Sequence, residues 1–206
     1  IGLILSYWKS VTLWVVNVDG SDLRQLATVD YPGPAARNYP LWTRDSRALV
    51  YIRDRQVNQN ETRRSFRLVD VSSGEDRLLL EDNVEQLSSW PLGWSANGQL
   101  LYYVRSVIDK GSELWAVDRE ERTSRSLGSL GKASMPFLSP DGDKLLFVSP
   151  QSLSWSLTES QVQQDILALS PKQWCGSVWS PDSAQVILCR ADVQQPIEYI
   201  EAININ

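Results

Sequence analysis

The chain has 206 residues, with 20 lysines and arginines against 25 aspartates and glutamates, and it contains two cysteines, nine tryptophans and no histidine. Without histidine it cannot build a Ser-His-Asp or Cys-His catalytic set, a histidine-ligated metal site or an imidazole pH switch. Its net charge of −5 gives no overall attraction to nucleic acid or to anionic membranes, and no run reaches the roughly 20 apolar residues of a membrane helix.

The predicted elements are short strands, several of which alternate apolar and polar residues before a turn rich in Asp, Gly and Ser. In chain order they cover residues 3–8, 13–17, 23–27, 49–52, 66–70, 77–80, 100–104, 114–118, 124–127, 145–148, 166–170, 186–188 and 197–203. A further short strand precedes each of four tight turns, and three strands of a first blade, three full blades and three strands of a fifth make about 18 strands in all.

Four segments repeat one pattern: an apolar or aromatic residue, a small hydroxyl residue, a tight turn and a strongly apolar strand. The turn residues Asp45, Asn97, Asp141 and Asp182 lie 52, 44 and 41 residues apart. Repeats of this length with tight hairpins indicate propeller blades of four strands each. The predicted fold is therefore all-β, a β-propeller of four-stranded antiparallel blades. Trp42, Trp94 and Trp179 share one repeat position and Trp14 and Trp115 share another, and all five are predicted to pack between blades.

The Ser-Pro-Asp-Gly turn at 139–142, the Leu-Leu-Phe-Val strand at 145–148 and Leu-Trp-x-Val-Asp strands such as 114–118 resemble the WD-like, TolB-type propeller repeat. The resemblance extends from about residue 4 to residue 203. Family members include TolB itself and the propellers of prolyl-oligopeptidase-like peptidases, so the resemblance implies a fold without choosing a function. The chain departs from the pattern at Arg44 and Ala96, where Pro is usual, and at Leu138, where an aromatic residue is usual.

The strand count gives about four and a half blades, with boundaries near residues 30, 84, 130 and 172. The chain starts at a second strand and stops after the third strand of a fifth blade. Either the ring closes with incomplete blades, or the missing strands lie outside these residues. We favour the second interpretation, in which residues 1–206 are a single propeller domain or most of one within a longer chain.

Longer connections are expected at residues 28–39, 53–65, 81–90, 105–112 and 149–165. In an up-and-down blade they all emerge on one face, and loops held on a rigid scaffold commonly carry binding. The candidate partner contacts on this face are Tyr31, Arg37, Tyr39, Arg53, Arg55, Arg63, Arg64, Trp90, Arg105 and Trp155.

An arginine cluster stands out against the acidic background. It consists of Arg53, Arg55, Arg63, Arg64 and Arg67, offset nearby in sequence by Asp54 and Glu61. Arginine forks suit carboxylate and phosphate partners, so an acidic protein segment or an anionic ligand is one interpretation. A solvated polar loop is the simpler one.

The two cysteines flank the last turn. With 181–183 as the turn and Ser180 facing Ala184, Cys175 and Cys189 become direct cross-strand neighbours, close enough for a disulfide. Disulfides persist in oxidising compartments, which favours an extracytoplasmic location, periplasmic or exported. The alternative is a pair of buried free thiols.

Motifs for catalysis are absent from the sequence: there is no nucleophile elbow, phosphate-binding loop, Cys-x-x-Cys pair or dinucleotide fingerprint. We therefore expect no catalytic residue, no metal ligand and no cofactor. The predicted function is a noncatalytic interaction or scaffold module with a protein partner, without nucleic-acid binding or direct membrane insertion. The alternative is the propeller of a larger prolyl-oligopeptidase-like hydrolase whose catalytic domain is not in this chain.

Overall fold

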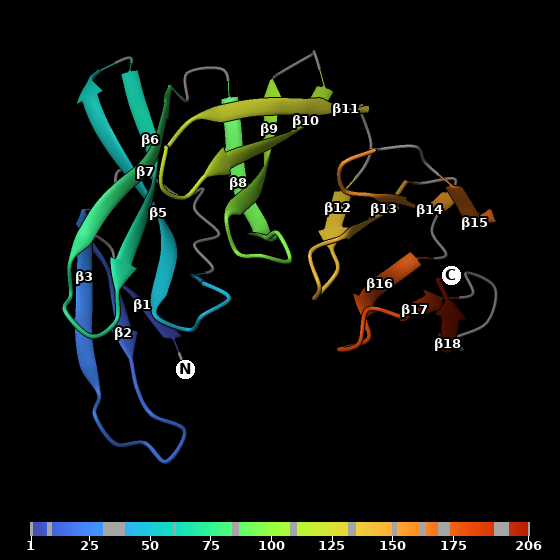
Figure 1. The fold of residues 1–206 in the computed structure, drawn as a ribbon, viewed down its shortest axis with the longest axis horizontal. Coiled ribbons are helices and arrows are strands. Elements are labelled where there is room, and N and C mark those ends of the chain that lie inside the picture. Colours follow the sequence, from blue (N-terminus) through green and yellow to red (C-terminus); the bar gives the residue numbers. More distant parts are fainter. Residues whose placement is uncertain are drawn as a thin grey trace. The chain divides into compact units, whose positions relative to one another are not determined.

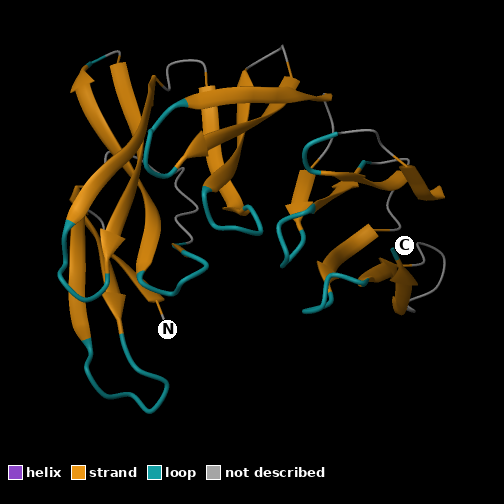
Figure 2. Ribbon diagram, in the orientation of Figure 1, coloured by secondary structure: helices purple, strands orange, loops and turns teal. Residues whose placement is uncertain are grey.

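The computed structural model of the chain describes residues 2–7, 10–30, 40–59, 61–83, 87–107, 111–131, 135–149, 152–160, 164–168, 174–191 and 198–205. These residues form eighteen strands in five sheets and no helix, which confirms the all-β prediction (Figures 1 and 2). In the described part of the chain, then, nothing has the helical length and hydropathy that a bilayer span requires.

Each sheet is built from strands that follow one another in the chain and pair with their sequence neighbours. The sheets are termed blades 1 to 5 below. Blade 1 contains β1 (Gly2–Tyr7), β2 (Ser10–Val15) and β3 (Arg24–Asp30), and blade 2 contains β4 (Leu41–Trp42), β5 (Ala48–Asn58), β6 (Glu61–Asp70) and β7 (Asp76–Asn83).

Blade 3 contains β8 (Leu87–Trp94), β9 (Leu100–Val107), β10 (Gly111–Asp118) and β11 (Ser124–Gly131). Blade 4 contains β12 (Met135–Leu138), β13 (Lys144–Val148), β14 (Ser152–Leu157) and β15 (Gln164–Ala168), and blade 5 contains β16 (Trp174–Trp179), β17 (Gln185–Ala191) and β18 (Glu198–Asn204). The chain divides into two compact units, Ile1–Ile108 with Ala116–Arg125 and Asp109–Trp115 with Ser126–Asn206.

The core of the first unit lies between successive blades. Leu13 of blade 1 packs with Leu49, Tyr51 and Val69 of blade 2, and Trp42 lies against this cluster. The first five residues of β5 are all buried, so both faces of this strand are covered. An unbroken apolar run is what such a strand requires, in contrast to the alternation of a half-exposed strand.

The second unit is organised in the same way, with blades 4 and 5 in contact. Its buried cluster consists of Leu146, Val148, Leu153, Trp179, Val186, Leu188 and Ile205. Trp179 also donates from its indole nitrogen to the carbonyl oxygen of Phe137 at 3.0 Å. Trp179 and Trp42 lie in these clusters between blades, as predicted, and Trp94 is buried, whereas Trp14 and Trp115 are only half-buried.

The repeated turns share one hydrogen-bond arrangement. In blade 2 the Thr43 hydroxyl donates to Asp45 Oδ1 at 2.6 Å and accepts the Ala48 N–H at 3.0 Å, while Asp45 Oδ1 accepts the Arg47 N–H at 3.0 Å. The same three bonds recur from Ser95 and Asn97, from Ser139 and Asp141, and from Ser180 and Asp182. A hydroxyl residue followed two positions later by Asp or Asn therefore forms each turn through local bonds.

Arg44 explains one departure from the family pattern. Its guanidinium donates to the carbonyl oxygens of Ser95 at 3.3 Å and Trp94 at 3.2 Å, which ties the first turn of blade 2 to the first turn of blade 3. Proline has no side-chain donor and cannot make this link. Gly98, at a φ of +72°, completes the contact, because a Cβ there would lie 3.2 Å from the Arg44 Cβ.

The Thr43 turn predicts a pH dependence. The hydroxyl of Thr43, followed by the Arg47 N–H, lowers the pKa of Asp45 from 3.8 to about 2. Because the folded-state pKa is the lower one, the stabilisation is complete above the unfolded pKa and is lost as the pH falls toward 2. The variant Asp45→Asn keeps the acceptor but cannot titrate. Urea unfolding at about pH 5 and about pH 2.5 is expected to show a smaller acid loss in Asp45→Asn than in the natural chain; equal losses would contradict this origin.

Several expected loops are in fact strands. Residues 53–65 continue β5 and β6 in antiparallel register, with Asp54 opposite the oppositely charged Arg64 and Arg55 opposite the like-charged Arg63, so a charged segment forms a strand ladder instead of a loop. Residues 149–165 contain β14, whose alternating serines read as turn residues in the sequence. The strand expected at 166–170, which aligns in the sequence with the third strands at 13–17, 66–70 and 114–118, is consequently the fourth strand of blade 4, β15.

The register expected for the last hairpin is wrong by one residue from the turn to Gly176, and the irregularity there restores the expected register at Trp174, which pairs with Arg190. Ser180 pairs with Gln185 through a 2.9 Å backbone bond, so Cys189 lies opposite Gly176, and a register irregularity separates Trp174 from Gly176. The turn contains four residues between its paired ends, where three were expected. Cys189 is not a free thiol in the structure, whereas the side chain of Cys175 lies outside the described residues. The disulfide itself stays a prediction.

Candidate functional site

The structure distributes the expected contact residues over several strands. Tyr31, Arg37 and Tyr39 lie outside the described residues. Of the others, Arg53 and Arg55 lie on β5, Arg63 and Arg64 on β6, Trp90 on β8, Arg105 on β9 and Trp155 on β14. The four arginines of β5 and β6 belong to one hairpin, which has the two longest strands in the described part of the chain.

Arg64 is a structural residue. It is 8% exposed, and its guanidinium binds both carboxylate oxygens of Asp54, at 2.8 and 2.7 Å. Its remaining end donates to the carbonyl oxygen of Ser89 on β8 at 2.9 Å. All three guanidinium nitrogens of Arg64 therefore donate a hydrogen bond within the protein. Arg64 joins the hairpin to blade 3, and we withdraw it from the candidate partner contacts.

Arg55 and Arg63 point to the other side of the hairpin and are exposed. Arg63 contacts Glu61 at 3.0 Å and Glu81 at 3.3 Å, and Arg55 reaches Glu81 at 4.0 Å. The hydrogen bonds that Arg63 donates to Glu61 and then to Glu81 raise the pKa of Arg63. The sequence does not reveal Glu81 as a partner, because it lies on β7 and reaches the arginines only through the strand register.

Arg67, the fifth arginine of the cluster, is also engaged inside the protein. Its Nε lies 3.0 Å from both carboxylate oxygens of Asp76, and the same carboxylate accepts a 2.8 Å bond from the Tyr51 hydroxyl. Burial, together with the Asp76 contact, raises the pKa of Tyr51. Arg67 is thus part of a closed polar network and does not face solvent as a binding group.

Four side chains of the hairpin remain. Arg53 and Arg55 alternate along β5, Arg63 lies directly opposite Arg55 on β6, and Val57 follows at the register irregularity between Gln56 and Asn58. Since alternate strand residues point the same way, the three arginines share a face; this face, together with the exposed Val57 at its end, is termed the arm surface. Among the described residues Arg53 has no ion pair, and Val57 is one of the exposed large apolar residues.

The remaining expected contacts have mixed surroundings. Trp90 is half-buried opposite Val104, and Arg105 is half-buried opposite Ser89. Trp155 packs against the buried cluster of the second unit and is therefore a core residue rather than a loop residue. These positions do not join the arm surface.

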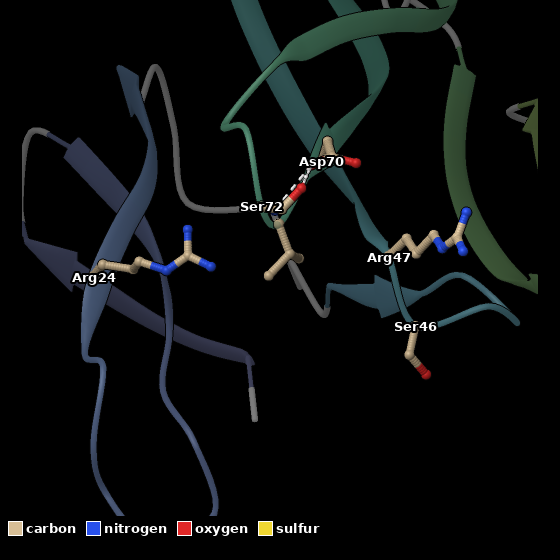
Figure 3. Close-up of a pocket in the computed structure, with 6 residues that line it drawn as sticks. Arg24, Ser46, Arg47, Asp70 and Ser72 are labelled. Atoms are coloured by element: carbon tan, nitrogen blue, oxygen red, sulfur yellow. Dashed lines mark hydrogen bonds between the residues drawn. The ribbon is translucent and has the colours of Figure 1, made fainter.

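The sequence did not indicate a cleft at the opposite, short-turn end of blades 1 and 2. It has a volume of about 470 Å³ and is lined by Arg24, Ser46, Arg47, Asp70, Val71 and Ser72. In Figure 3, Arg24 extends toward the Asp70–Ser72 turn while the side chain of Arg47 points away from it. The Asp70 carboxylate already accepts bonds from Ser73 and Ser72, which hold its pKa well below the usual range. The polar groups of this cleft do not converge on one point.

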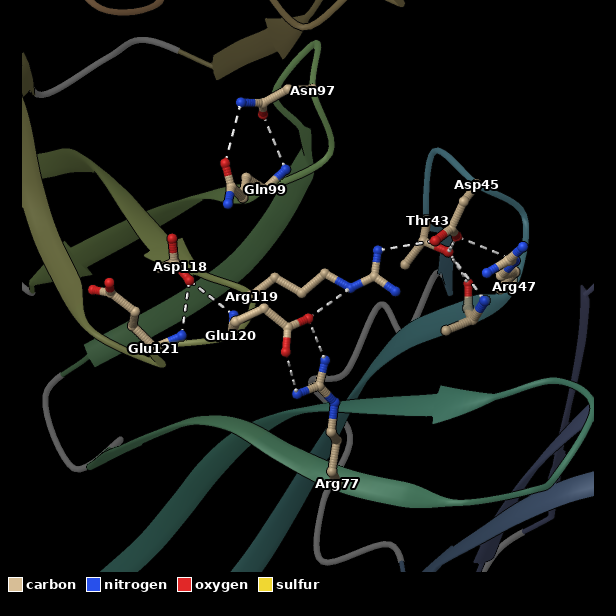
Figure 4. Close-up of polar contacts among 11 residues, drawn as sticks. Thr43, Asp45, Arg47, Arg77, Asn97, Gln99, Asp118, Arg119, Glu120 and Glu121 are labelled. Atoms are coloured by element: carbon tan, nitrogen blue, oxygen red, sulfur yellow. Dashed lines mark hydrogen bonds and ion pairs between the residues drawn. The ribbon is translucent and has the colours of Figure 1, made fainter.

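Ion pairs occupy the short-turn end of blades 2 and 3 (Figure 4). Arg119 contacts Asp45 at 3.2 Å and lies 5.8 Å from the ring centre of Trp94, and Glu120 pairs with Arg77 at 3.2 Å. From the sequence alone, charged turn residues of this kind are predicted to be solvated, because their ion-pair partners lie on another blade and are far away in the sequence. This network neutralises the short-turn end and leaves the arm surface as the more cationic of the two.

No family model matches the chain, and no curated protein matches it. Three solved structures are similar: TolB from Acinetobacter baumannii (15% identity, 97% of this chain, 51% of that chain, TM-score 0.65), the β-propeller domain of the Trilobed protease from Pyrococcus furiosus (12%, 98%, 64%, 0.64), and a prolyl endopeptidase (12%, 99%, 33%, 0.67). The chain has a TolB-type β-propeller fold of about four and a half blades. It spans half the length of that TolB and one third of the endopeptidase.

Proposed function

We propose that this propeller is a noncatalytic interaction module that binds a protein partner through the blade ends carrying the β5–β6 hairpin. The observation that carries the proposal is the arm surface, where three arginines share one face of the longest described hairpin and an exposed valine lies at its end. A rigid ladder presents these side chains with little ordering cost on binding.

The partner proposed for this surface is an acidic protein segment. Arginine forks pair with carboxylates, and Val57 adds an apolar contact beside them. Glu61 and Glu81 already neutralise part of the charge of Arg55 and Arg63. Binding is therefore expected to depend on the fit of several contacts and to weaken as salt screens the exposed charges.

A charge reversal tests the arm surface. Binding of a synthetic ten-residue peptide of alternating Glu and Val, measured by fluorescence anisotropy, is expected to weaken by roughly tenfold in the double variant Arg55→Glu, Arg63→Glu, because like charges then face the peptide. The control is Arg125→Glu, an exposed arginine on β11 that should leave the affinity within about twofold. Equal affinities for both variants, or no binding by the natural chain, would reject the surface.

The alternative function is the propeller of a larger prolyl-oligopeptidase-like hydrolase. The similarity to the propellers of two peptidases supports it, as does the one-third share of the endopeptidase that the chain spans. Since the chain contains no histidine, a Ser-His-Asp set needs residues from another domain. The coding sequence on either side of these residues discriminates: a nucleophile elbow in a separate domain supports the hydrolase, and further blades alone support the interaction module.

An extracytoplasmic location belongs to the same proposal and depends on the cysteines. Cys189 is not a free thiol, and the register irregularity at residues 174–176 lies beside it, which favours a bond to Cys175. Mass measurement of alkylated protein purified from its native compartment without reductant is expected to find no alkylated cysteine, and the variant Cys189→Ser to expose one. Two alkylated cysteines in the natural chain would place it in a reducing compartment.

A further inference from the structure

The first turn of blade 3 differs from the other repeated turns in one residue. Asp45, Asp141 and Asp182 hold the position that Asn97 holds in blade 3, and a glycine follows Asn97 directly. No other asparagine of the chain is followed by glycine. Asparagine before glycine readily loses its side-chain amide, because glycine has no Cβ to shield its backbone nitrogen. Asn97 is exposed, so water reaches it.

The loss of this amide is deamidation, and its only co-reactant is water. The backbone nitrogen of Gly98 bonds to Cγ of Asn97 and gives up its proton, while the bond from Cγ to Nδ2 breaks and ammonia leaves with that proton. Water then opens the succinimide ring. Opening at Cγ restores the ordinary backbone with aspartate at position 97, and opening at the backbone carbonyl gives isoaspartate.

The folded turn restrains both reacting groups. Asn97 Oδ1 accepts the Ser95 hydroxyl at 2.7 Å and the Gln99 N–H at 3.0 Å, which fixes the side chain (Figure 4). The Gly98 N–H donates to the carbonyl oxygen of Ser95 at 2.8 Å, and Gly98 is buried. A hydrogen-bonded N–H keeps its proton and is a poor nucleophile. Deamidation therefore requires that the turn open first.

A side chain from the neighbouring blade fastens this turn. The Arg44 guanidinium donates to the same Ser95 carbonyl oxygen at 3.3 Å and to that of Trp94 at 3.2 Å. These two bonds are termed the Arg44 clasp. Opening the turn breaks the clasp as well as the bonds of the turn itself, so the clasp lowers the fraction of molecules in which the turn is open.

The other turns show that aspartate suits this position. In each of them a carboxylate accepts the same hydroxyl and N–H bonds that Asn97 accepts. The Ser180 hydroxyl lowers the pKa of Asp182 in this way, so an aspartate at position 97 would be ionised at neutral pH. Isoaspartate instead lengthens the backbone by one carbon and would displace the Gln99 N–H from its acceptor.

We propose that Asn97 is a site of deamidation and that the Arg44 clasp sets the rate of the reaction. The reaction proceeds through the small fraction of molecules in which the first turn of blade 3 is open. Molecules that form aspartate gain a negative charge and keep the turn, whereas those that form isoaspartate lose it. The proposal does not depend on the arm surface or on its partner.

Peptide mapping by mass spectrometry measures the fraction of Asn97 converted over time at mildly alkaline pH. Conversion in the natural chain is expected to be at least about tenfold slower in native buffer than in guanidinium chloride, because turn opening limits it. Asn17 is the internal control, since the branched side chain of Val18 shields the attacking nitrogen and keeps its conversion slow in both conditions. Equal rates for Asn97 in the two conditions would overturn the protection.

Arg44→Met removes the clasp but keeps the apolar stem of the side chain. It is expected to convert Asn97 at least about threefold faster than the natural chain in native buffer, and equally fast in denaturant. Arg47→Met is the matched control, because it changes an exposed arginine of the same turn and leaves the clasp intact. Equal rates for the two variants in native buffer would show that the clasp has no role.

Two further variants complete the test. Phe66→Leu weakens the packing of blades 2 and 3 without touching the clasp, so it is expected to convert Asn97 more slowly than Arg44→Met does. The opposite order would mean that global unfolding sets the rate and would overturn the proposal. Asn97→Asp is expected to unfold at the same temperature as the natural chain, and a clear loss of thermal stability would show that the turn rejects aspartate.

Discussion

Arg64→Met is expected to lower the free energy of unfolding by about 3–5 kcal/mol, the usual cost of breaking a buried ion pair from one side. The substitution leaves the Asp54 carboxylate, whose side chain is 16% exposed, without its bidentate partner. It also removes the donor to the Ser89 carbonyl on the neighbouring blade. Urea unfolding at neutral pH measures the loss.

The double variant Arg64→Met, Asp54→Leu is expected to recover most of this loss, because neither charge is then left buried alone. Arg63→Met serves as the control on the same strand. Arg63 is itself exposed and its ion pairs are open to solvent, so its effect should stay within about 1 kcal/mol. If the Arg64 and Asp54 effects simply add, the pair is not coupled and the structural role of Arg64 is wrong.

Phe66→Ala is expected to cost about 3–5 kcal/mol, in the range of large buried aromatic truncations. The Phe66 side chain is fully buried, and its ring meets Tyr103 at an interplanar angle of 86°. The cavity would open between blades 2 and 3, where neither backbone can collapse without breaking a strand ladder. Chemical unfolding measures the change in free energy.

A second substitution separates the aromatic contact from simple volume. Phe66→Leu keeps most of the apolar volume but loses the edge-to-face pair, which is worth about 0.5–1.5 kcal/mol. It should therefore fall well below Phe66→Ala in cost. Val57→Ala, an exposed position in the same hairpin, should change stability by less than about 0.5 kcal/mol. A Phe66→Ala loss as small as that would mean that this contact does not hold the blades together.

The repeated turns were predictable because their bonds are local. Thr43 and Asp45 lie two residues apart, and so do Ser139 and Asp141, so the sequence itself contains the complete hydrogen-bonding group. The same holds for the apolar strands that follow. The five sheets follow from these local patterns, which recur at blade spacing.

Other features depend on register and on neighbouring blades. Arg64 reads as a surface arginine until strand register places it beside Asp54, ten residues away, and blade packing places it beside Ser89. Serines 152, 154 and 156 read as loop residues, yet two of them are buried between apolar neighbours on β14. The register of the last hairpin differed from the expected one near the turn because that turn is one residue longer than its sequence suggested.

The candidate site likewise combines features that the sequence reveals with features that depend on strand register. Arg53, Arg55 and Arg63 were found because charge clusters are visible in a sequence. Their carboxylate partner Glu81 was missed, since β7 pairs with β6 only in the folded sheet. The sequence could therefore indicate where arginines gather, but not how many of them are already neutralised.

The close contact between Arg44 and Gly98 restricts which residues can occupy positions 44 and 98. Gly98 is limited both by its positive φ and by the Arg44 Cβ, 3.2 Å from where its own Cβ would lie. Relatives that keep arginine at 44 should therefore keep glycine at 98, whereas relatives with proline at 44 lose the donor that links the two turns. The two positions, 54 residues apart, are expected to vary together. A substitution in the first turn of blade 2 would then be accompanied by a substitution in the first turn of blade 3.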